Sequence, residues 1–206
     1  MCRFCNIVKG NYKYEGIDNP FNENDDFFAI ASIGSMIEGW SLIIPKKHQL
    51  SMRNIYKNDN FKKIVNELLP LMSNKYGNII SFEHGSNEEG SITACGTDHA
   101  HLHLVPFKDS LVYELENSGL KWEQCLSSEI KNKTDNKEYL FYSDINSTTN
   151  WEDPTGYLHI LEYPISQYFR HLLAKKIDKV EESDYKIFPF LENAVQTRLT
   201  FNKLIA

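Results

Sequence analysis

Cysteine is scarce in this sequence, with four among 206 residues. A chain of this length can bury an apolar core of its own, so four cysteines do not indicate a fold held together by disulfides. Long apolar runs are missing too, because no stretch approaches the roughly 18 residues of a membrane helix. The opening Met-Cys-Arg-Phe-Cys lacks the apolar core of a signal peptide. We therefore expect a cytoplasmic protein without a membrane partner.

An excess of positive charge is also absent. The chain has 22 Lys and Arg against 28 Asp and Glu, which gives a formal net charge of −6. Proteins that coat nucleic acid rely on a basic surface, so we expect no extended nucleic-acid surface. What is present is 41% hydrophobic and 13% aromatic residues, a composition typical of a packed globular protein.

The order of the apolar runs in the first half predicts an α+β fold. Short runs bounded by Gly, Pro or polar residues are typical of strands, and apolar residues at three- and four-residue steps are typical of a helix. The predicted elements are a strand at 27–31, a strand at 40–45, a helix at 58–76, a strand at 78–82 and a strand at 99–105. The first two strands are expected to pair antiparallel, and Pro70 is expected to kink or shorten the helix.

The second half of the chain has a weaker pattern. Residues 127–138 are polar and predict a loop or linker. Segments 138–142 and 156–162 predict a β-hairpin, and helices are expected over 165–176 and 188–203. The aromatic content of these segments indicates a folded appendage and not a tail.

Three histidines alternate in the segment HAHLHLV, residues 99–105. Alternate side chains of a strand share one face, so His99, His101 and His103 are expected on one face, with the alanine and leucines between them in the core. Two kinds of chemistry suit such a row. A metal ligand donates its ring lone pair to the ion, whereas a nucleophile must keep that lone pair free.

A neutral imidazole that is held by a hydrogen bond on its other nitrogen is well suited to attack phosphorus. A neighbouring imidazolium can neutralise phosphate oxygens or protonate the leaving group. The residues alone leave metal ligation and nucleophilic catalysis both open, and different histidines can serve the two.

The four cysteines divide into a pair and two single residues. Cys2 and Cys5 form Cys-x-x-Cys, a spacing that in a reducing compartment indicates a metal or redox pair; the alternative is two ordinary thiols. Cys95 and Cys125 have no partner in the pattern and are expected to pack as small apolar side chains.

With these motifs in order, the sequence resembles the histidine triad family of nucleotide hydrolases and transferases. The resemblance is carried by the cysteine pair at 2–5, by GWSLIIPKKH at 39–48 and by HAHLHLVP at 99–106. Their order and spacing agree with the family over about residues 1–107, roughly half of the chain. Residues 108–206 match nothing in the pattern.

The resemblance implies an α+β fold with an antiparallel sheet and flanking helices, commonly dimerised, that binds a nucleoside phosphate against the triad. Residues 1–107 would form a HIT-like nucleotide-binding catalytic domain. Residues 108–206 would add a C-terminal extension of β-hairpin and helices, packed on this core, that is a candidate cover for the active site. Within it, Gln167, Arg170 and His171 are candidates for the covering face, and Arg170 suits a phosphate; an ordinary surface helix is the other interpretation.

By the family pattern, His101 attacks the α-phosphorus to give a covalent nucleotidyl-histidine, and water or another acceptor then releases the nucleotide. His103 is the second catalytic residue and contacts the phosphate. Gly96 and Thr97 are further candidate phosphate ligands, because glycine allows close backbone approach and threonine offers a hydroxyl. The chemical step requires no metal.

The resemblance also implies a structural zinc ion. The family positions that hold it correspond here to Cys2, Cys5, His48 and His99. Two thiolates and two imidazoles make a closed tetrahedral site of the structural kind, and this set leaves His101 without a metal.

At three positions the chain departs from the common family pattern. Trp40 stands where a histidine is usual, so a histidine relay to His101 through this position is absent. Ser32 aligns with an aspartate that holds the ribose, and Glu83 begins the segment that usually reads Asn-x-Gly. Recognition of base and sugar is therefore expected to differ from the purine-nucleoside members.

The predicted function is a nucleotide hydrolase or nucleotidyltransferase that acts on a phosphate or phosphoramidate bond at the α-phosphorus of a nucleoside phosphate derivative. One alternative is a nucleotide-binding or sensing protein whose degenerate site has little catalysis. Another is a hydrolase in which the three triad histidines hold a catalytic zinc.

Overall fold

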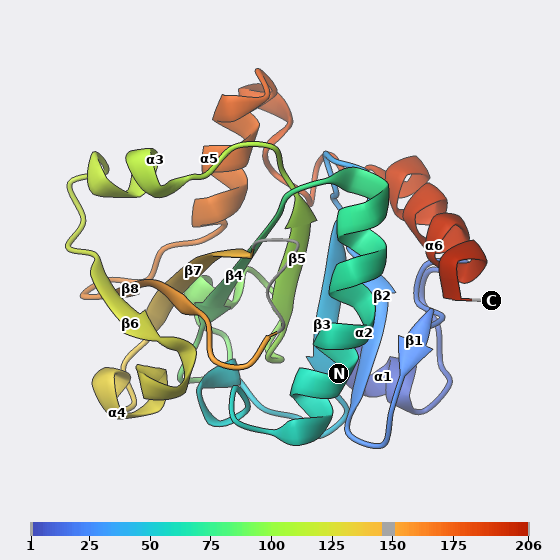
Figure 1. The fold of residues 1–206 in the computed structure, drawn as a ribbon, viewed down its shortest axis with the longest axis horizontal. Helices are drawn as coiled ribbons and strands as arrows, with labels where there is room; N and C mark the ends of the chain where they lie inside the picture. Colours follow the sequence, from blue (N-terminus) through green and yellow to red (C-terminus); the bar gives the residue numbers. More distant parts are fainter. Residues whose placement is uncertain (1, 146–150, 206) are drawn as a thin grey trace.

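A computed structural model describes residues 2–145 and 151–205. Its centre is an eight-stranded sheet with the order β1-β2-β3-β5-β4-β7-β8-β6, in which all neighbours pair antiparallel (Figure 1). The strands are β1 Asn22–Glu23, β2 Phe27–Ala31, β3 Ser41–Pro45, β4 Ile79–Gly85, β5 Leu102–Pro106, β6 Glu123–Leu126, β7 Tyr139–Ile145 and β8 Thr155–Ile160. The predicted α+β class and the antiparallel pairing of the first two long strands are confirmed.

Helices flank both faces of this sheet. They are α1 Arg3–Val8, α2 Asp59–Tyr76, α3 Val112–Glu116, α4 Ile130–Thr134, α5 Tyr168–Lys176 and α6 Leu191–Ile205. The long α2 lies across one face (Figure 1), and side chains of α1, α3 and α5 belong to the core on the opposite face. No helix within the described ranges is long and apolar enough to cross a membrane.

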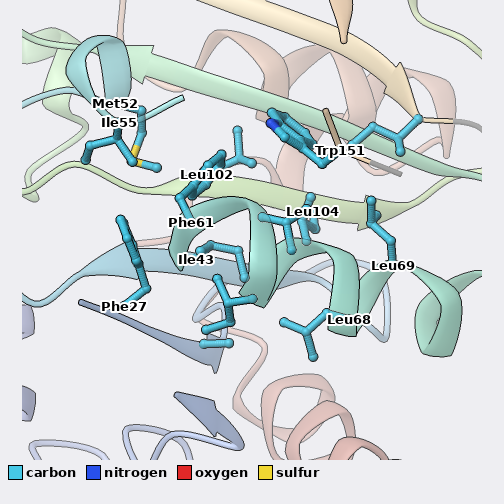
Figure 2. Packing of buried hydrophobic residues seen from close by; sticks show 14 of the residues in the cluster. Phe27, Ile43, Met52, Ile55, Phe61, Leu68, Leu69, Leu102, Leu104 and Trp151 are labelled. Atoms are coloured by element: carbon cyan, nitrogen blue, oxygen red, sulfur yellow. The ribbon is translucent and has the colours of Figure 1, made fainter. Parts of the chain in front are cut away.

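The apolar stripe of α2 forms the larger core (Figure 2). Asn58 caps its start by accepting the Phe61 N–H, and six of its apolar side chains are buried against the sheet. Gly77, at φ 85°, closes its end. The helix continues for 18 residues through Pro70, so the expected shortening is wrong. Pro70 is exposed, and the buried side chains on both sides of it hold the two halves of the helix to the sheet.

The alternation predicted for the histidine strand is confirmed by the two cores. Leu102 and Leu104 pack with α2 (Figure 2), and His103 stacks on Phe82 on the opposite face, at a ring separation of 4.5 Å. The strand itself begins at Leu102 and not at residue 99. The Ala100 N–H donates to the carbonyl of Gln49, which lies in a loop, so the first two histidines precede the ladder.

The C-terminal half extends the same sheet. The predicted hairpin is confirmed as β7 and β8, and β7 pairs with the whole length of β4. The segment predicted to be a linker contains α4, with Ile130 and Thr134 buried, so this prediction is wrong in part. The last two predicted helices form, but they begin three residues late, at Tyr168 and Leu191.

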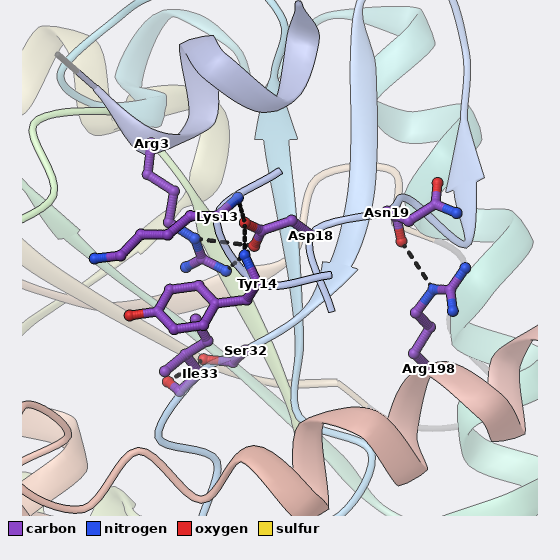
Figure 3. A network of polar contacts seen from close by, with 8 residues as sticks. All are labelled: Arg3, Lys13, Tyr14, Asp18, Asn19, Ser32, Ile33 and Arg198. Carbon is purple, nitrogen blue, oxygen red and sulfur yellow. Dashed lines mark hydrogen bonds and ion pairs between the residues drawn. The ribbon is translucent and has the colours of Figure 1, made fainter. Parts of the chain in front are cut away.

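Helix α6 is fixed to the opposite edge of the sheet by apolar and polar contacts. Phe201 stacks on Phe21 at a ring separation of 4.4 Å, and Thr197 Oγ1 accepts the N–H of Gly39. The Arg198 guanidinium donates to the Asn19 carbonyl (Figure 3). These contacts tie the end of the chain to the N-terminal core.

We expect Phe201→Ala to lower the free energy of unfolding by about 3–5 kcal/mol, because the ring is fully buried and its removal leaves a cavity. Leu204→Ala on the same helix is the control. Leu204 is 37% exposed, so its truncation should cost less than about 1 kcal/mol. Urea unfolding followed by circular dichroism measures both. Equal small losses would show that α6 is not part of the folding unit.

Candidate active site

Two of the triad rings, those of His101 and His103, line a small pocket that we call the histidine pocket. Its volume is ≈ 60 Å³, and its walls include His101, His103, Trp40, Phe82, Gln167 and Arg170. The first four come from the N-terminal core, and the last two come from the start of α5 and the residue before it. Residues far apart in the sequence thus enclose one site.

His99 is the most deeply buried member of the row, at 1% exposure. Its Nε2 donates to the Pro45 carbonyl at 2.8 Å, so the lone pair of the neutral ring is on Nδ1. That Nδ1 lies 3.3 Å from Cys2 Sγ and 3.7 Å from Cys5 Sγ. Burial lowers the pKa of His99 to about 4, which keeps the ring in the neutral form that a metal ligand needs.

The two cysteines and two histidines of the predicted zinc set lie together. Their ligand atoms all lie within 4.8 Å of one another. Among the residues that the structure describes, this group is the one with a geometry suited to a metal ion. His48 joins through Nδ1, 3.3 Å from Cys5 Sγ. The short helix α1 begins between the two cysteines and so brings both sulfurs to the end of β3 and to His99.

His101 is held in the opposite tautomer. Its Nδ1 donates to the His99 carbonyl at 2.8 Å, which leaves the lone pair on Nε2. Burial lowers the pKa of His101, although the hydrogen bond to the carbonyl acts in the other direction. The edge of the Phe4 ring packs on the imidazole, with 5.6 Å between ring centres. The result is a neutral imidazole with a fixed orientation at the pocket wall.

His103 receives a hydrogen bond instead of donating one. The indole Nε1–H of Trp40 donates to His103 Nδ1 at 2.9 Å. Since an indole nitrogen can only donate, the proton of the neutral His103 ring is on Nε2. Burial holds the pKa of His103 well below its usual range, and His101, His84 and Arg170 add to this effect. His103 is therefore a neutral N–H donor and not an imidazolium.

Trp40 thus has a definite place in the site. The sequence showed only that it replaces a histidine; the structure shows a fully buried ring that fixes the tautomer of His103. The three triad rings do not converge on one point, because His99 Nδ1 faces the sulfurs and His103 Nδ1 is occupied by Trp40. Within the described part of the chain, they form no metal-binding group of their own.

Two other departures from the family pattern fall in different places. Ser32 lines the histidine pocket, where its hydroxyl donates to the Ile33 carbonyl (Figure 3). Glu83 lies outside the pocket walls. Its buried carboxylate accepts from the hydroxyls of Tyr56 and Tyr139 and from the Met52 N–H, and burial raises its pKa. Glu83 is a structural link between β4, β7 and the loop before α2.

The loop before the triad borders two pockets. Thr97 lines the histidine pocket and an adjoining pocket of ≈ 270 Å³, while Gly96 lines the adjoining pocket. The Thr97 N–H is used by the Ala94 carbonyl, whereas the Gly96 N–H has no acceptor among the described residues. Cys95, which was predicted to pack as a small apolar side chain, also lines the histidine pocket. Cys125 is buried in the core, as predicted.

The C-terminal half contributes a pocket residue that the sequence pattern of residues 108–206 did not indicate. Tyr185 lines both pockets, and its hydroxyl donates to the Cys95 carbonyl at 2.6 Å. A single tyrosine in a polar loop gives no signal in a sequence. His84 also lines the histidine pocket; burial lowers its pKa to about 3, and its Nε2 has no hydrogen-bond partner in the described ranges.

Comparison with known proteins adds a family to this geometry. No family model matches the sequence. Over 108 residues, the chain is 32% identical to an uncharacterised HIT-like protein of Mycoplasma pneumoniae, which covers 51% of this chain and 70% of that protein. The chain belongs to the histidine triad, or HIT-like, family. The predicted membership is confirmed.

The chain is also similar to a second curated protein and to solved structures. An adenosine 5′-monophosphoramidase of Candida albicans is 27% identical over 131 residues, covering 59% of this chain and 77% of that protein. A solved structure of a hypothetical histidine triad nucleotide-binding protein from Sulfolobus tokodaii has a TM-score of 0.41 and 21% identity, over 53% of this chain and 71% of that chain.

We expect Trp40→Phe to remove the hydrogen bond that fixes the tautomer of His103. The substitution keeps an aromatic ring at this position but removes the N–H donor that stabilises a neutral Nδ1, so the pKa of His103 should rise and stay below its ordinary value because burial remains. Nitrogen-15 NMR of the histidine rings measures both the tautomer and the pKa.

Trp122→Phe is the matched control, because the indole of Trp122 donates to Ser118 and not to the triad. It should leave the His103 signals unchanged. A wild-type His103 that carries its proton on Nδ1 would contradict the assignment.

Proposed function

We propose that this HIT-like protein is a nucleotide hydrolase or nucleotidyltransferase that acts through a covalent intermediate on His101. The observation that carries the proposal is the hydrogen bond from His101 Nδ1 to the His99 carbonyl. This bond keeps the lone pair of the neutral imidazole on Nε2, in a residue that lines the pocket. The adenosine 5′-monophosphoramidase relative supports a nucleoside phosphate derivative as substrate.

In the first step, His101 Nε2 attacks the α-phosphorus, and the bond from phosphorus to the leaving group breaks. The electron pair departs with the leaving group, and a leaving amine takes a proton from solvent water. His103 Nε2–H donates to a non-bridging oxygen and stabilises the charge that develops there. In the second step, water or another protic acceptor attacks phosphorus and gives up its proton to solvent, the phosphorus–nitrogen bond breaks, and His101 recovers its lone pair. No metal takes part in either step.

The two adjoining pockets suit the two parts of such a substrate. The histidine pocket is the smaller of the two, ≈ 60 Å³ against ≈ 270 Å³, so it suits a phosphoryl group better than a nucleoside. The neighbouring pocket of ≈ 270 Å³ shares Arg3, Ile33, Thr97 and Tyr185 with it. A nucleoside in the second pocket would place its 5′-phosphate in the first, with Gly96 and Thr97 at the boundary.

We expect His101→Ala to lower kcat/KM by about 10³-fold or more on any nucleoside phosphate or phosphoramidate that the wild type cleaves, because it removes the nucleophile. His101→Gly should regain part of the activity when imidazole is added, since free imidazole can occupy the vacated space. His171→Ala is the control. The structure places His171 outside the walls of the histidine pocket, at an exposed position of α5, so its replacement should retain wild-type turnover.

The same experiment separates the enzyme from its alternative. Wild-type turnover by His101→Ala would refute the covalent mechanism. Tight nucleotide binding in calorimetry without turnover of any substrate, by the wild type itself, would instead identify a nucleotide-binding or sensing protein.

The Cys2, Cys5, His48 and His99 group fits a structural zinc. In a tetrahedral site with Zn–S of about 2.3 Å and Zn–N of about 2.0 Å, a sulfur and a nitrogen ligand lie about 3.5 Å apart. Three of the four sulfur–nitrogen distances here are 3.3, 3.3 and 3.7 Å, and the fourth is within 4.8 Å. The hydrogen bond from His99 to Pro45 also points the free lone pair at the sulfurs. The ion would fix α1 against the triad strand and take no part in the chemistry.

About one zinc per chain should copurify, and the double variant Cys2→Ser with Cys5→Ser should lose the metal and unfold at lower temperature. Elemental analysis and thermal unfolding measure these two effects. Cys95→Ser, whose sulfur lies outside the group, should keep the metal. Wild-type protein that is free of metal after purification without chelators would contradict the site.

The homodimer and the cytoplasmic location stay predictions.

A further inference from the structure

Two guanidinium groups line the histidine pocket, and only one of them is neutralised. Arg3 donates to the Asp18 carboxylate, which also accepts the N–H groups of Lys13 and Tyr14 (Figure 3). Arg170 has no carboxylate within ion-pairing distance among the described residues. Since a buried cation without a counter-ion is costly, the unpaired one calls for an explanation.

Contacts with several neighbouring groups hold the Arg170 side chain in place. It is 6% exposed, and its guanidinium carbon lies 4.5 Å from the ring centre of Trp40 and 5.6 Å from that of Tyr185. Nη1 donates to the Gly34 carbonyl. Cation–π contacts hold a guanidinium in place while leaving its edge free. Burial lowers the pKa of Arg170 to about 10, so the group is still charged at neutral pH.

The remaining N–H groups of this guanidinium have no acceptor among the described residues. A guanidinium has five N–H donors in one plane, and here only Nη1 donates to protein. Such a planar set of donors matches two oxygens of a phosphoryl group. The pocket offers no other permanent charge for this purpose, because Arg3 is paired and His103 is held neutral by Trp40.

We propose that Arg170, from the C-terminal half of the chain, binds the phosphoryl group of the substrate in the histidine pocket. The proposal rests on the proposed function in that the ligand is the phosphate of a nucleoside phosphate. Trp40 then serves two groups at once: its N–H fixes His103 as a neutral donor, and its ring face holds Arg170. Positive charge that a protonated triad histidine would have supplied comes instead from α5.

Calorimetric titration with inorganic phosphate and with AMP tests this without turnover. Arg170→Gln should weaken binding of both by tenfold or more, because it removes the charge and the planar donors. Arg170→Lys, which keeps the charge but not the planar donors, should fall between Arg170→Gln and the wild type. Arg198→Gln removes the same charge from α6, outside the walls of the histidine pocket, and should bind within twofold of the wild type.

A measurement on the wild type covers the case in which Arg170→Gln does not fold. In nitrogen-15 NMR, the Arg170 Nε–H signal should shift as phosphate is added, and the Arg198 signal should not. Arg170→Gln that binds phosphate as well as the wild type would overturn the proposal. So would wild-type protein that binds no phosphate, or an Arg170 signal that stays still.

The outcomes also separate this proposal from the covalent mechanism. His101→Ala should lose turnover and still bind phosphate through Arg170. If His101→Ala keeps its turnover while Arg170→Gln loses phosphate, the mechanism is wrong and the phosphate site stands. If Arg170→Gln keeps phosphate while His101→Ala loses turnover, the mechanism stands and the phosphate site is wrong.

Discussion

Each imidazole of the triad has one ring nitrogen fixed by a neighbouring group, and that contact decides what the other nitrogen can do. The Pro45 carbonyl accepts a hydrogen bond from His99 Nε2–H, which leaves the Nδ1 lone pair for the cysteine group. The His99 carbonyl accepts a hydrogen bond from His101 Nδ1–H, which leaves the lone pair on Nε2. Trp40 donates to His103 and leaves a proton on its Nε2. Three identical side chains therefore become a metal ligand candidate, a nucleophile candidate and a donor.

These contacts depend on the position of the triad at the start of β5. β5 lies between β3 and β4, so its leucines are buried under α2. On the other face, the His103 ring packs against the rings of Trp40 and Phe82. The first two histidines precede the ladder, so the His99 carbonyl is free to accept from His101. A strand that began at residue 99 would direct that carbonyl into the sheet.

The C-terminal half is joined to the N-terminal half by a sheet and a pocket, not by a linker alone. β7 pairs with β4 along its whole length, and α5 carries Phe169 onto Phe82, behind His103. This arrangement brings Arg170 and Tyr185 into the wall of the histidine pocket. The site is thus enclosed by segments that share no motif, which is why the pattern of residues 108–206 gave only candidates for a covering face.

The sequence by itself determined the histidine row, the cysteine pair and the main strands and helix of the first half, because periodicity and spacing are local properties. The resemblance to the histidine triad family named the four residues that the structure gathers into one group. Tertiary structure decided the tautomers, the role of Trp40 and the place of Glu83 and Arg170. Those depend on which groups meet across the sheet, such as Trp40 with His103, 63 residues apart. A replacement that looked like the loss of a histidine is, in three dimensions, the gain of a hydrogen-bond donor.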